Sequence, residues 1–261
     1  SVWMYEASSD MAWSSTEEYP RNAWYHWALV RTSATEILFF INGKKVGTIA
    51  TTADREINWA LNGGYCTIGY NEADSNAGII GRMDEVRFSN TARWTEDFTP
   101  PDAPYSKQVV EGRWRTRSAS GLVSIATPAD GDIPCFDATA TVGGGNDANT
   151  RLLLQPSTSD HGIVDQAAGN AAPVTLENHN VTGNMVFDGS NAYLKIPANT
   201  LPSDFFNGTD EWTLDIVYNV ASKSMQCLFG CSSSLRMDFL LDSNGLLQIG
   251  GGPNLGTGWP F

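Results

Sequence analysis

The chain has 261 residues, with 16 Lys and Arg against 29 Asp and Glu, so its formal net charge is −13. This charge argues against a nucleic-acid-binding protein, because phosphate contacts need a basic surface. A hydrophobic content of 41% supports a sizeable core, and no apolar run is long enough to cross a membrane, so we expect no membrane insertion. The first residues lack the basic and apolar regions of a signal peptide.

The composition favours an all-β protein with many turns, because glycine (25 residues) and aromatics (11%) are plentiful while charged residues are only 17%. Four cysteines are too few for a disulfide scaffold in a chain of this length. Cys227 and Cys231 have no second pair or histidine nearby, so a zinc site is not expected. We expect buried thiols instead.

The first block of the chain, residues 1–105, alternates apolar strands with turns. Strands are predicted at 24–31, 37–49, 65–71 and 78–90. Asn42 and Gly43 divide the second of these into a hairpin, because both residues tolerate the positive φ of a tight turn.

The last of these strands, 78–90, has an imperfect period of two. Its predicted core residues are Ile80, Met83, Val86 and Phe88. Their spacing predicts a β-bulge near Gly81.

The middle segment, 106–149, has a different character. Arg113, Arg115 and Arg117 alternate as on one face of an extended strand. Residues 141–150 are predicted to be a flexible hinge because they carry a glycine triplet. This segment is predicted to be a linker or a small β element.

The last block, residues 150–261, again reads as antiparallel β. Its strongest strand is 210–220, where one face carries Trp212, Leu214, Ile216, Tyr218 and Val220. A hairpin turn is predicted at residues 242–245.

Several of these segments resemble the laminin-G-like and pentraxin-like branch of the concanavalin A-like lectin/glucanase superfamily. The matching pieces are WYHWALVR (24–31), LFFINGKKVG (38–47), TIGYN (67–71), GRMDEVRFSNTARW (81–94), LLL (152–154), DQAAGN (165–170), MVFDGSNAYLKIP (185–197) and EWTLDIVYN (211–219). The resemblance implies an all-β fold, an antiparallel two-sheet jelly-roll sandwich.

The order of the pieces is reversed relative to the family, whose early pieces stand here in the last block. Two arrangements explain this order. Either 1–105 is the C-terminal half of one sandwich and 150–261 the N-terminal half of a second, with 106–149 between them, or the chain forms one permuted sandwich. We favour the serial arrangement, because termini that interrupt a sandwich expose strand edges.

Residues 86–105 also resemble the ending, and residues 147–154 the opening, of sandwich domains in bacteriophage tail fibres and other virion appendages. This resemblance implies a structural or adhesion protein at a virion surface or outside the cell. Its partners would be other virion subunits, further copies of the chain and host-surface glycans. The alternative is a secreted or cell-surface carbohydrate-binding module.

Enzymatic activity is not expected. Retaining glycoside hydrolysis needs two carboxyl groups on one face, whereas the adjacent Asp84 and Glu85 are predicted to point to opposite faces of their strand. Glu211 and Asp215 have no third carboxylate at the required spacing. His26 lies in an aromatic strand, where a structural role is expected rather than catalysis.

Calcium is the candidate metal, because it prefers clustered oxygens on loops. The candidate ligands are Asp74, Asn76, Asp188 and Asn191. The alternative for each is a turn role, since Asp and Asn side chains bond to nearby backbone. No other cofactor is expected.

Sugar binding would use aromatic faces on loops. The candidate residues are Trp13, Tyr19, Trp59 and Trp94. Packing against a small apolar cluster is the alternative for Trp13 and Trp59. The strand aromatics Trp24, Trp27 and Trp212 are instead predicted to pack in the core.

Overall fold

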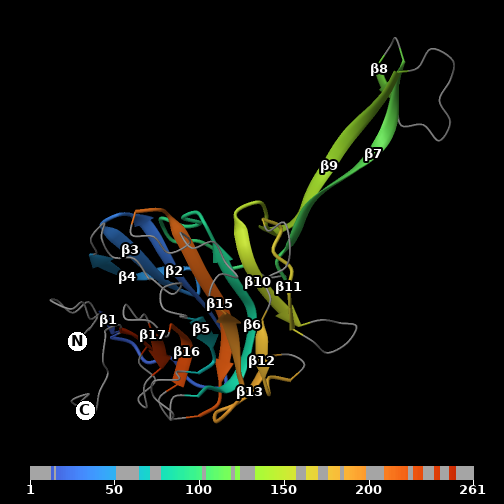
Figure 1. Ribbon diagram of the computed structural model, residues 1–261. Helices are drawn as coiled ribbons and strands as arrows, with labels where there is room; N and C mark the ends of the chain where they lie inside the picture. Colours follow the sequence, from blue (N-terminus) through green and yellow to red (C-terminus); the bar gives the residue numbers. More distant parts are fainter. Residues whose placement is uncertain are drawn as a thin grey trace. The chain divides into compact units, whose positions relative to one another are not determined.

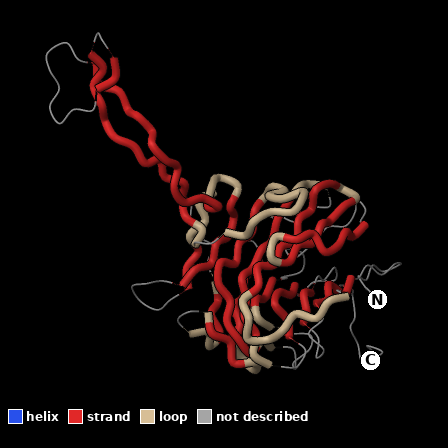
Figure 2. Tube along the Cα trace, turned by 180° about the vertical axis from the view of Figure 1, so that it is seen from behind, coloured by secondary structure: helices blue, strands red, loops and turns tan. Residues whose placement is uncertain are grey.

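The computed structural model describes residues 13–14, 16–50, 65–70, 78–101, 104–118, 121–123, 133–156, 163–169, 176–182, 185–197, 209–222, 226–231, 238–241 and 247–250. Within these ranges the chain forms strands, turns and loops, with no helix (Figure 2). It contains two compact units, one of Ser1–Pro100 with Ala148–Phe261 and one of Pro101–Asp147. Among the described residues, no helix is long and apolar enough to cross a membrane.

One sheet of the large unit has eight described strands. They are β2 (Tyr25–Ser33), β3 (Glu36–Ile41), β4 (Lys44–Ala50), β6 (Ile80–Ser89), β10 (Thr150–Pro156), β11 (Ile163–Asp165), β13 (Val186–Asp188) and β15 (Trp212–Val220). Their order is β11–β10–β6–β15–β2–β3–β4, and β13 pairs with β6 beside this path (Figure 1).

The second sheet has seven described strands. They are β1 (Trp13–Ser14), β5 (Tyr65–Ile68), β12 (Glu177–His179), β14 (Tyr193–Pro197), β16 (Gln226–Cys231), β17 (Asp238–Leu241) and β18 (Leu247–Gly250). Their order is β1–β18–β17–β16–β5–β14–β12. The pairings in both sheets are antiparallel, so the predicted all-β, two-sheet sandwich is confirmed.

Both sheets contain strands from both blocks of the chain, and strands of one block lie between strands of the other. In the eight-stranded sheet β15, from the last block, lies between β2 and β6, from the first block. In the seven-stranded sheet β5 lies between β14 and β16. This is the permuted single sandwich and not the serial arrangement that the sequence favoured. Pairing with the other block gives the central strands partners on both sides, which removes the exposed edges that had counted against permutation.

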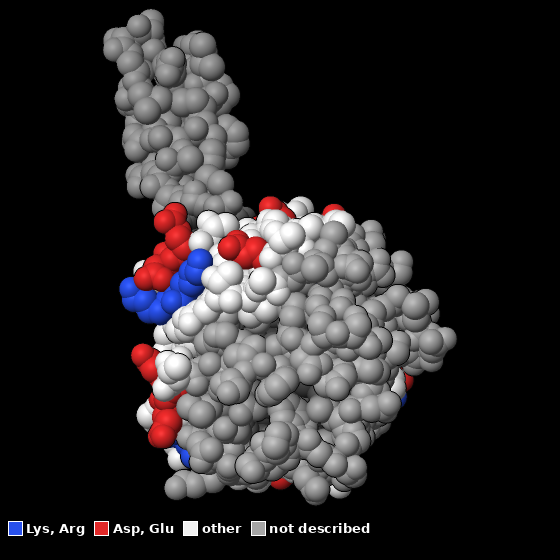
Figure 3. Space-filling view, turned by 90° about the vertical axis from the view of Figure 1, so that its left-hand side faces the viewer, with Lys and Arg blue, Asp and Glu red and all other residues white. Residues whose placement is uncertain are grey.

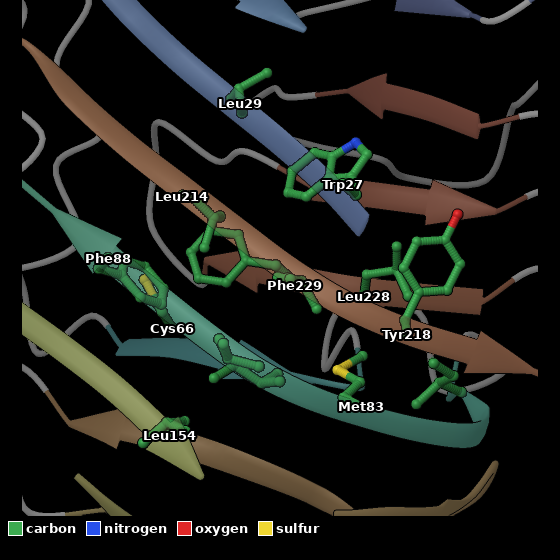
Figure 4. Packing of buried hydrophobic residues seen from close by; sticks show 14 of the residues in the cluster. Trp27, Leu29, Cys66, Met83, Phe88, Leu154, Leu214, Tyr218, Leu228 and Phe229 are labelled. Carbon is green, nitrogen blue, oxygen red and sulfur yellow. The ribbon is translucent and has the colours of Figure 1, made fainter. Parts of the chain in front are cut away.

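The core fills the space between the two sheets. Figure 4 draws ten labelled members of this cluster, all at most 1% exposed: Trp27, Leu29, Met83, Phe88, Leu154, Leu214 and Tyr218 from the larger sheet, and Cys66, Leu228 and Phe229 from the smaller one. Cys66 and Cys227 are buried free thiols, as predicted. The period-two face of β15 is confirmed in full, because all five of its predicted core residues are buried.

Two expectations for β6 were wrong. Ile80 is 39% exposed instead of buried. The bulge lies further along the strand. Asp215 pairs with Arg87 and Val217 pairs with Asp84, so two steps along β15 oppose three steps along β6, and the extra residue belongs to β6. Gly81 has another reason to be glycine, since a Cβ there would lie 2.2 Å from the carbonyl oxygen of Asn219 on the neighbouring strand.

The predicted turn at Asn42 and Gly43 joins β3 to β4, with φ of 48° and 75°. The smaller unit contains β7 (Ser106–Ser118), β8 (Gly121–Val123) and β9 (Ile133–Asn146), in the order β8–β7–β9. The predicted hinge at 141–150 is therefore wrong over residues 141–146, which pair with β7. The turn predicted at 242–245 lies outside the described residues.

Candidate functional site

The face of the eight-stranded sheet that points away from the core, here called the outer face, carries the polar side chains of the central strands. Trp27, Leu29 and Tyr218 point into the core. Because side chains alternate along a strand, His26 and Ala28 of β2 belong to the outer face, as do Asp215, Val217 and Asn219 of β15. Trp24 directly precedes β2.

One part of the outer face is covered by residues 91–98, here called the strap. Its side chains Ala92, Trp94 and Phe98 pack on a second apolar cluster formed by Ala28, Val30, Leu38 and Phe40. Trp94 and Phe98 stack with their ring centroids 4.0 Å apart and nearly parallel.

The strap is fastened at both ends by hydrogen bonds. Near its start, the backbone N–H of Arg93 donates to Oγ1 of Thr213 over 3.0 Å, and that hydroxyl donates to the carbonyl of Thr91. Near its end, the N–H of Phe98 donates to the carbonyl of Gly43 over 2.8 Å. The carboxylate of Asp97 accepts from the side chain of Lys44 and from the backbone of Lys45.

A buried charged cluster lies beneath the strap. Arg87 Nε lies 2.9 Å from Asp215 Oδ2, and His26 Nε2 lies 3.5 Å from Asp215 Oδ1. All three residues are at most 6% exposed. The Arg87 guanidinium also lies 5.3 Å from the ring centroid of Trp94. His26 is therefore a buried partner of the Asp215 carboxylate, which agrees with the structural role expected for it, because a buried carboxylate needs close polar partners.

Beyond the strap, the outer face is open to solvent. We call this region the open patch, and it comprises Trp24, Ile80, Arg82, Asp84, Val217 and Asn219. Trp24 (50% exposed) and Ile80 (39%) are the exposed large hydrophobic residues of the described chain, and both lie here. No hydrogen bond or ion pair in the described part of the chain engages the side chains of Trp24, Arg82 and Asn219. These groups are therefore available to a ligand.

Sequence reasoning missed this patch. It placed Trp24 in the core with Trp27, yet Trp24 directly precedes β2 and is 50% exposed, whereas Trp27 is fully buried. The strict alternation of WYHWALVR contained this signal, because Trp24 is in phase with His26 and Ala28, which the outer face also carries.

Asp84 and Glu85 do not point to opposite faces, which corrects a further expectation. Asp84 pairs with Val217 on the outer face. The Glu85 carboxylate accepts from Nε2 of Gln155, 2.8 Å from each oxygen, and Gln155 follows the core residue Leu154 on β10. The bulge causes this change, since Glu85 has a φ of 51° and its extra residue resets the alternation.

Burial affects the charge of Asp84. Partial desolvation raises the pKa of the Asp84 carboxyl, while a hydrogen bond from the backbone N–H of Glu85, 2.9 Å long, acts in the opposite direction.

The structure describes the side chains of two candidate sugar-binding aromatics, Tyr19 and Trp94, and they lie in different apolar clusters. Tyr19 is buried in the main core and contacts Tyr25 edge-to-face, and this burial raises the pKa of its phenol. Trp94 is half-buried in the strap. Trp13 lies in β1, where the structure describes its backbone alone, and Trp59 lies outside the described residues. Neither of the last two predictions is tested.

Of the four candidate calcium ligands, two lie among the described residues and two do not. Asp188 and Asn191 lie at an exposed turn after β13, where one Asp188 oxygen accepts the backbone N–H groups of Ser190, Asn191 and Ala192. These bonds lower the pKa of Asp188. This is the turn role given above as the alternative to calcium binding. Asp74 and Asn76 lie outside the described residues, so the calcium prediction stays open.

Charges of both signs lie side by side on the surface. In the view of Figure 3, the described Lys and Arg atoms adjoin Asp and Glu atoms instead of forming a separate basic field. One such pair is exposed, with Lys44 Nζ 2.8 Å from Asp97 Oδ2.

Comparison with known proteins identifies the first block. Residues 1–97 match the family model described as the concanavalin A-like lectin/glucanases superfamily. No curated protein and no solved structure matched the chain.

The match confirms the resemblance over residues 1–97, and the two antiparallel sheets are consistent with a concanavalin A-like sandwich. Within this concanavalin A-like block the matched residues include Trp24, Ile80 and Arg82 of the open patch. Asn219 and Val217 come from the last block, so the patch needs both blocks.

Proposed function

We propose that this chain is a non-enzymatic glycan-binding or adhesion module, and that the open patch binds the glycan. The observation that supports this most directly is the half-exposed indole of Trp24 on the sandwich. It is joined by the Asn219 amide and the Arg82 guanidinium, whose side chains have no hydrogen bond or ion pair among the described residues. An indole face packs against the apolar face of a sugar ring, and amide and guanidinium groups hydrogen-bond to hydroxyls.

The absence of catalysis is part of the proposal. Hydrolysis of a glycoside needs one carboxyl as acid and another as base or nucleophile, both facing the substrate. On the outer face, Glu85 is bound by Gln155, and Asp215 is buried against Arg87 beneath the strap. Asp84 is thus the remaining carboxyl among the open-patch residues, and one carboxyl does not make an acid–base pair.

The biological setting we propose is a virion-surface appendage such as a tail fibre or a capsid decoration. Its support is the likeness of residues 86–105 and 147–154 to domains of that kind. Neighbouring virion subunits, including further copies of this chain, would then be partners, and repeated copies would strengthen weak sugar binding through multivalency. The second candidate is a secreted or cell-surface carbohydrate-binding module, for which a catalytic domain in the same polypeptide would be the distinguishing observation.

A glycan array probed with the intact protein assembly tests the proposal. We expect binding to a defined set of glycans, and roughly tenfold weaker binding by Trp24→Ala, because the indole supplies the main apolar contact. Lys45→Ala, an exposed change on the edge strand β4, is the matched control and should bind normally. Repeating the array with a chelator asks whether calcium takes part. Absence of binding with and without chelator would contradict glycan recognition and leave a scaffolding role.

A further inference from the structure

Two cysteines stand opposite each other in the seven-stranded sheet. Cys66 of β5 is the register partner of Cys231 of β16, and the two strands are antiparallel. Cys66 is a free thiol, 1% exposed, and belongs to the core between the sheets. The same register pairs Ile68 with Phe229, which also belong to that core. Positions 66 and 231 therefore share the face of the sheet that points to the core, because pairs two residues apart in one register lie on one face.

The hydrogen-bonding pattern determines whether the two backbones are close enough for a disulfide. The backbone N–H of Gly69 donates to the carbonyl of Leu228 over 3.0 Å, and these two residues continue the same register. Hydrogen-bonded pairs alternate with non-hydrogen-bonded pairs in an antiparallel ladder, so the pair of Cys66 and Cys231, three steps away, is of the second kind. In such a pair the Cα atoms are about 4.5 Å apart, which lies within the range of about 4.4–6.8 Å that a disulfide needs.

The neighbouring contacts hold this pairing in place. Ile196 of β14 pairs with Cys66 on its other side, so β5 lies between two strands. At the next position, Oγ1 of Thr67 lies 3.3 Å from the carbonyl oxygen of Gly230, and both atoms are buried. β5 belongs to the first block and β16 to the last block. A bond between the two cysteines would therefore join the two blocks of the sandwich covalently.

We infer that Cys66 and Cys231 form a disulfide when the chain folds under oxidising conditions. The two thiols lose two hydrogen atoms and form one S–S bond, while a small disulfide oxidant such as oxidised glutathione is reduced to two thiols. Because Cys66 is buried in the folded chain, the exchange takes place before β5 and β16 are enclosed, and the finished bond is shielded from reductants. The buried thiol of Cys66 described above is the reduced form of the same pair. The bond restricts the unfolded chain and so stabilises the sandwich.

Oxidative refolding of the full chain tests this inference. The denatured and reduced protein is refolded in a glutathione redox buffer, the remaining thiols are blocked, and the peptides are mapped without reduction. We expect the peptide that carries Cys66 to be linked to the peptide that carries Cys231, in the monomer band of a non-reducing gel. The oxidised protein should have a urea midpoint about 1 M above that of the reduced protein, because the bond closes a long loop.

Single-cysteine variants assign the link. Cys231→Ala should lose both the linked peptide and the redox-dependent shift of the urea midpoint. Cys227→Ala is the matched control and should keep both, because Cys227 lies on the same strand and is also buried but is not the register partner of Cys66. The comparison of the oxidised and reduced parent protein depends on no variant. The inference would be overturned by four titratable thiols after oxidative refolding, by a link from Cys66 to another cysteine, or by a link found only between chains.

Discussion

At the scale of single residues, the outer face divides into groups that are already bonded and groups that are free. Asp215 belongs to the first class, because it is fully buried and is the anionic partner of both Arg87 and His26. Arg82 belongs to the second class, since none of the described residues forms a hydrogen bond or ion pair with its side chain. The sequence places all of these residues on strands, but it does not say which charges the strap covers.

Asp215→Ala should be strongly destabilising. The change leaves the Arg87 guanidinium buried without its counter-ion, which costs about 3–5 kcal/mol when a buried pair loses one partner. Urea unfolding at neutral pH measures the loss, and Glu177→Ala, which removes an exposed partner of Lys195, is the control with little expected effect. A variant within about 1 kcal/mol of the parent would contradict the buried cluster.

Asp188 should make stability depend on pH through its turn. Its folded pKa is lowered by three backbone N–H groups, so the folded state binds protons less readily than the unfolded chain. This contribution is complete above the unfolded pKa of about 3.9 and disappears as the pH falls through the folded pKa.

We therefore expect the stability difference between the parent and Asp188→Ala to be constant near neutral pH and to shrink below about pH 4. Denaturant unfolding across this range provides the measurement. A turn role predicts the same difference with and without a chelator. If the chelator abolishes the difference at neutral pH, Asp188 is a calcium ligand instead.

At the scale of elements, the strap and the hairpin after β3 hold each other in place. Local patterns predicted the hairpin well, since Asn-Gly is suited to a positive φ at both positions. They did not predict the strap as a cover, because its partners Phe40 and Ala28 come from strands that look like ordinary core strands. The bulge was also misplaced, since Glu85 at a φ of 51° has no local sequence signature.

Gly43→Ala should loosen the strap. Gly43 has a φ of 75°, and a Cβ there would lie 1.9 Å from the carbonyl oxygen of Phe98. We expect a loss of more than about 1 kcal/mol, because both the backbone conformation and the contact disfavour a side chain. Thermal unfolding beside the Lys45→Ala control measures it, and an unchanged midpoint would mean that the strap does not rest on this turn.

At the scale of the whole molecule, the chain forms one sandwich from two separated blocks. The fold class could be predicted, because alternation and turn residues are local features that survive permutation. The pairing of the blocks could not, since a strand such as 210–220 has the same pattern whether its neighbours come from this chain or from another copy. The same holds for the open patch, since Arg82 of the first block and Asn219 of the last block are brought opposite each other by the register of β6 and β15.

The central claim is that β15 lies between β2 and β6 of the same chain, and nuclear Overhauser contacts test it most directly. The spectra would be recorded on labelled protein diluted into an excess of unlabelled protein, so that contacts within one chain are selected. We predict contacts from Leu214 to both Leu29 and Phe88, which are its register partners. Contacts that appear only between labelled and unlabelled chains, or not at all, would contradict the single sandwich and the patch built on it.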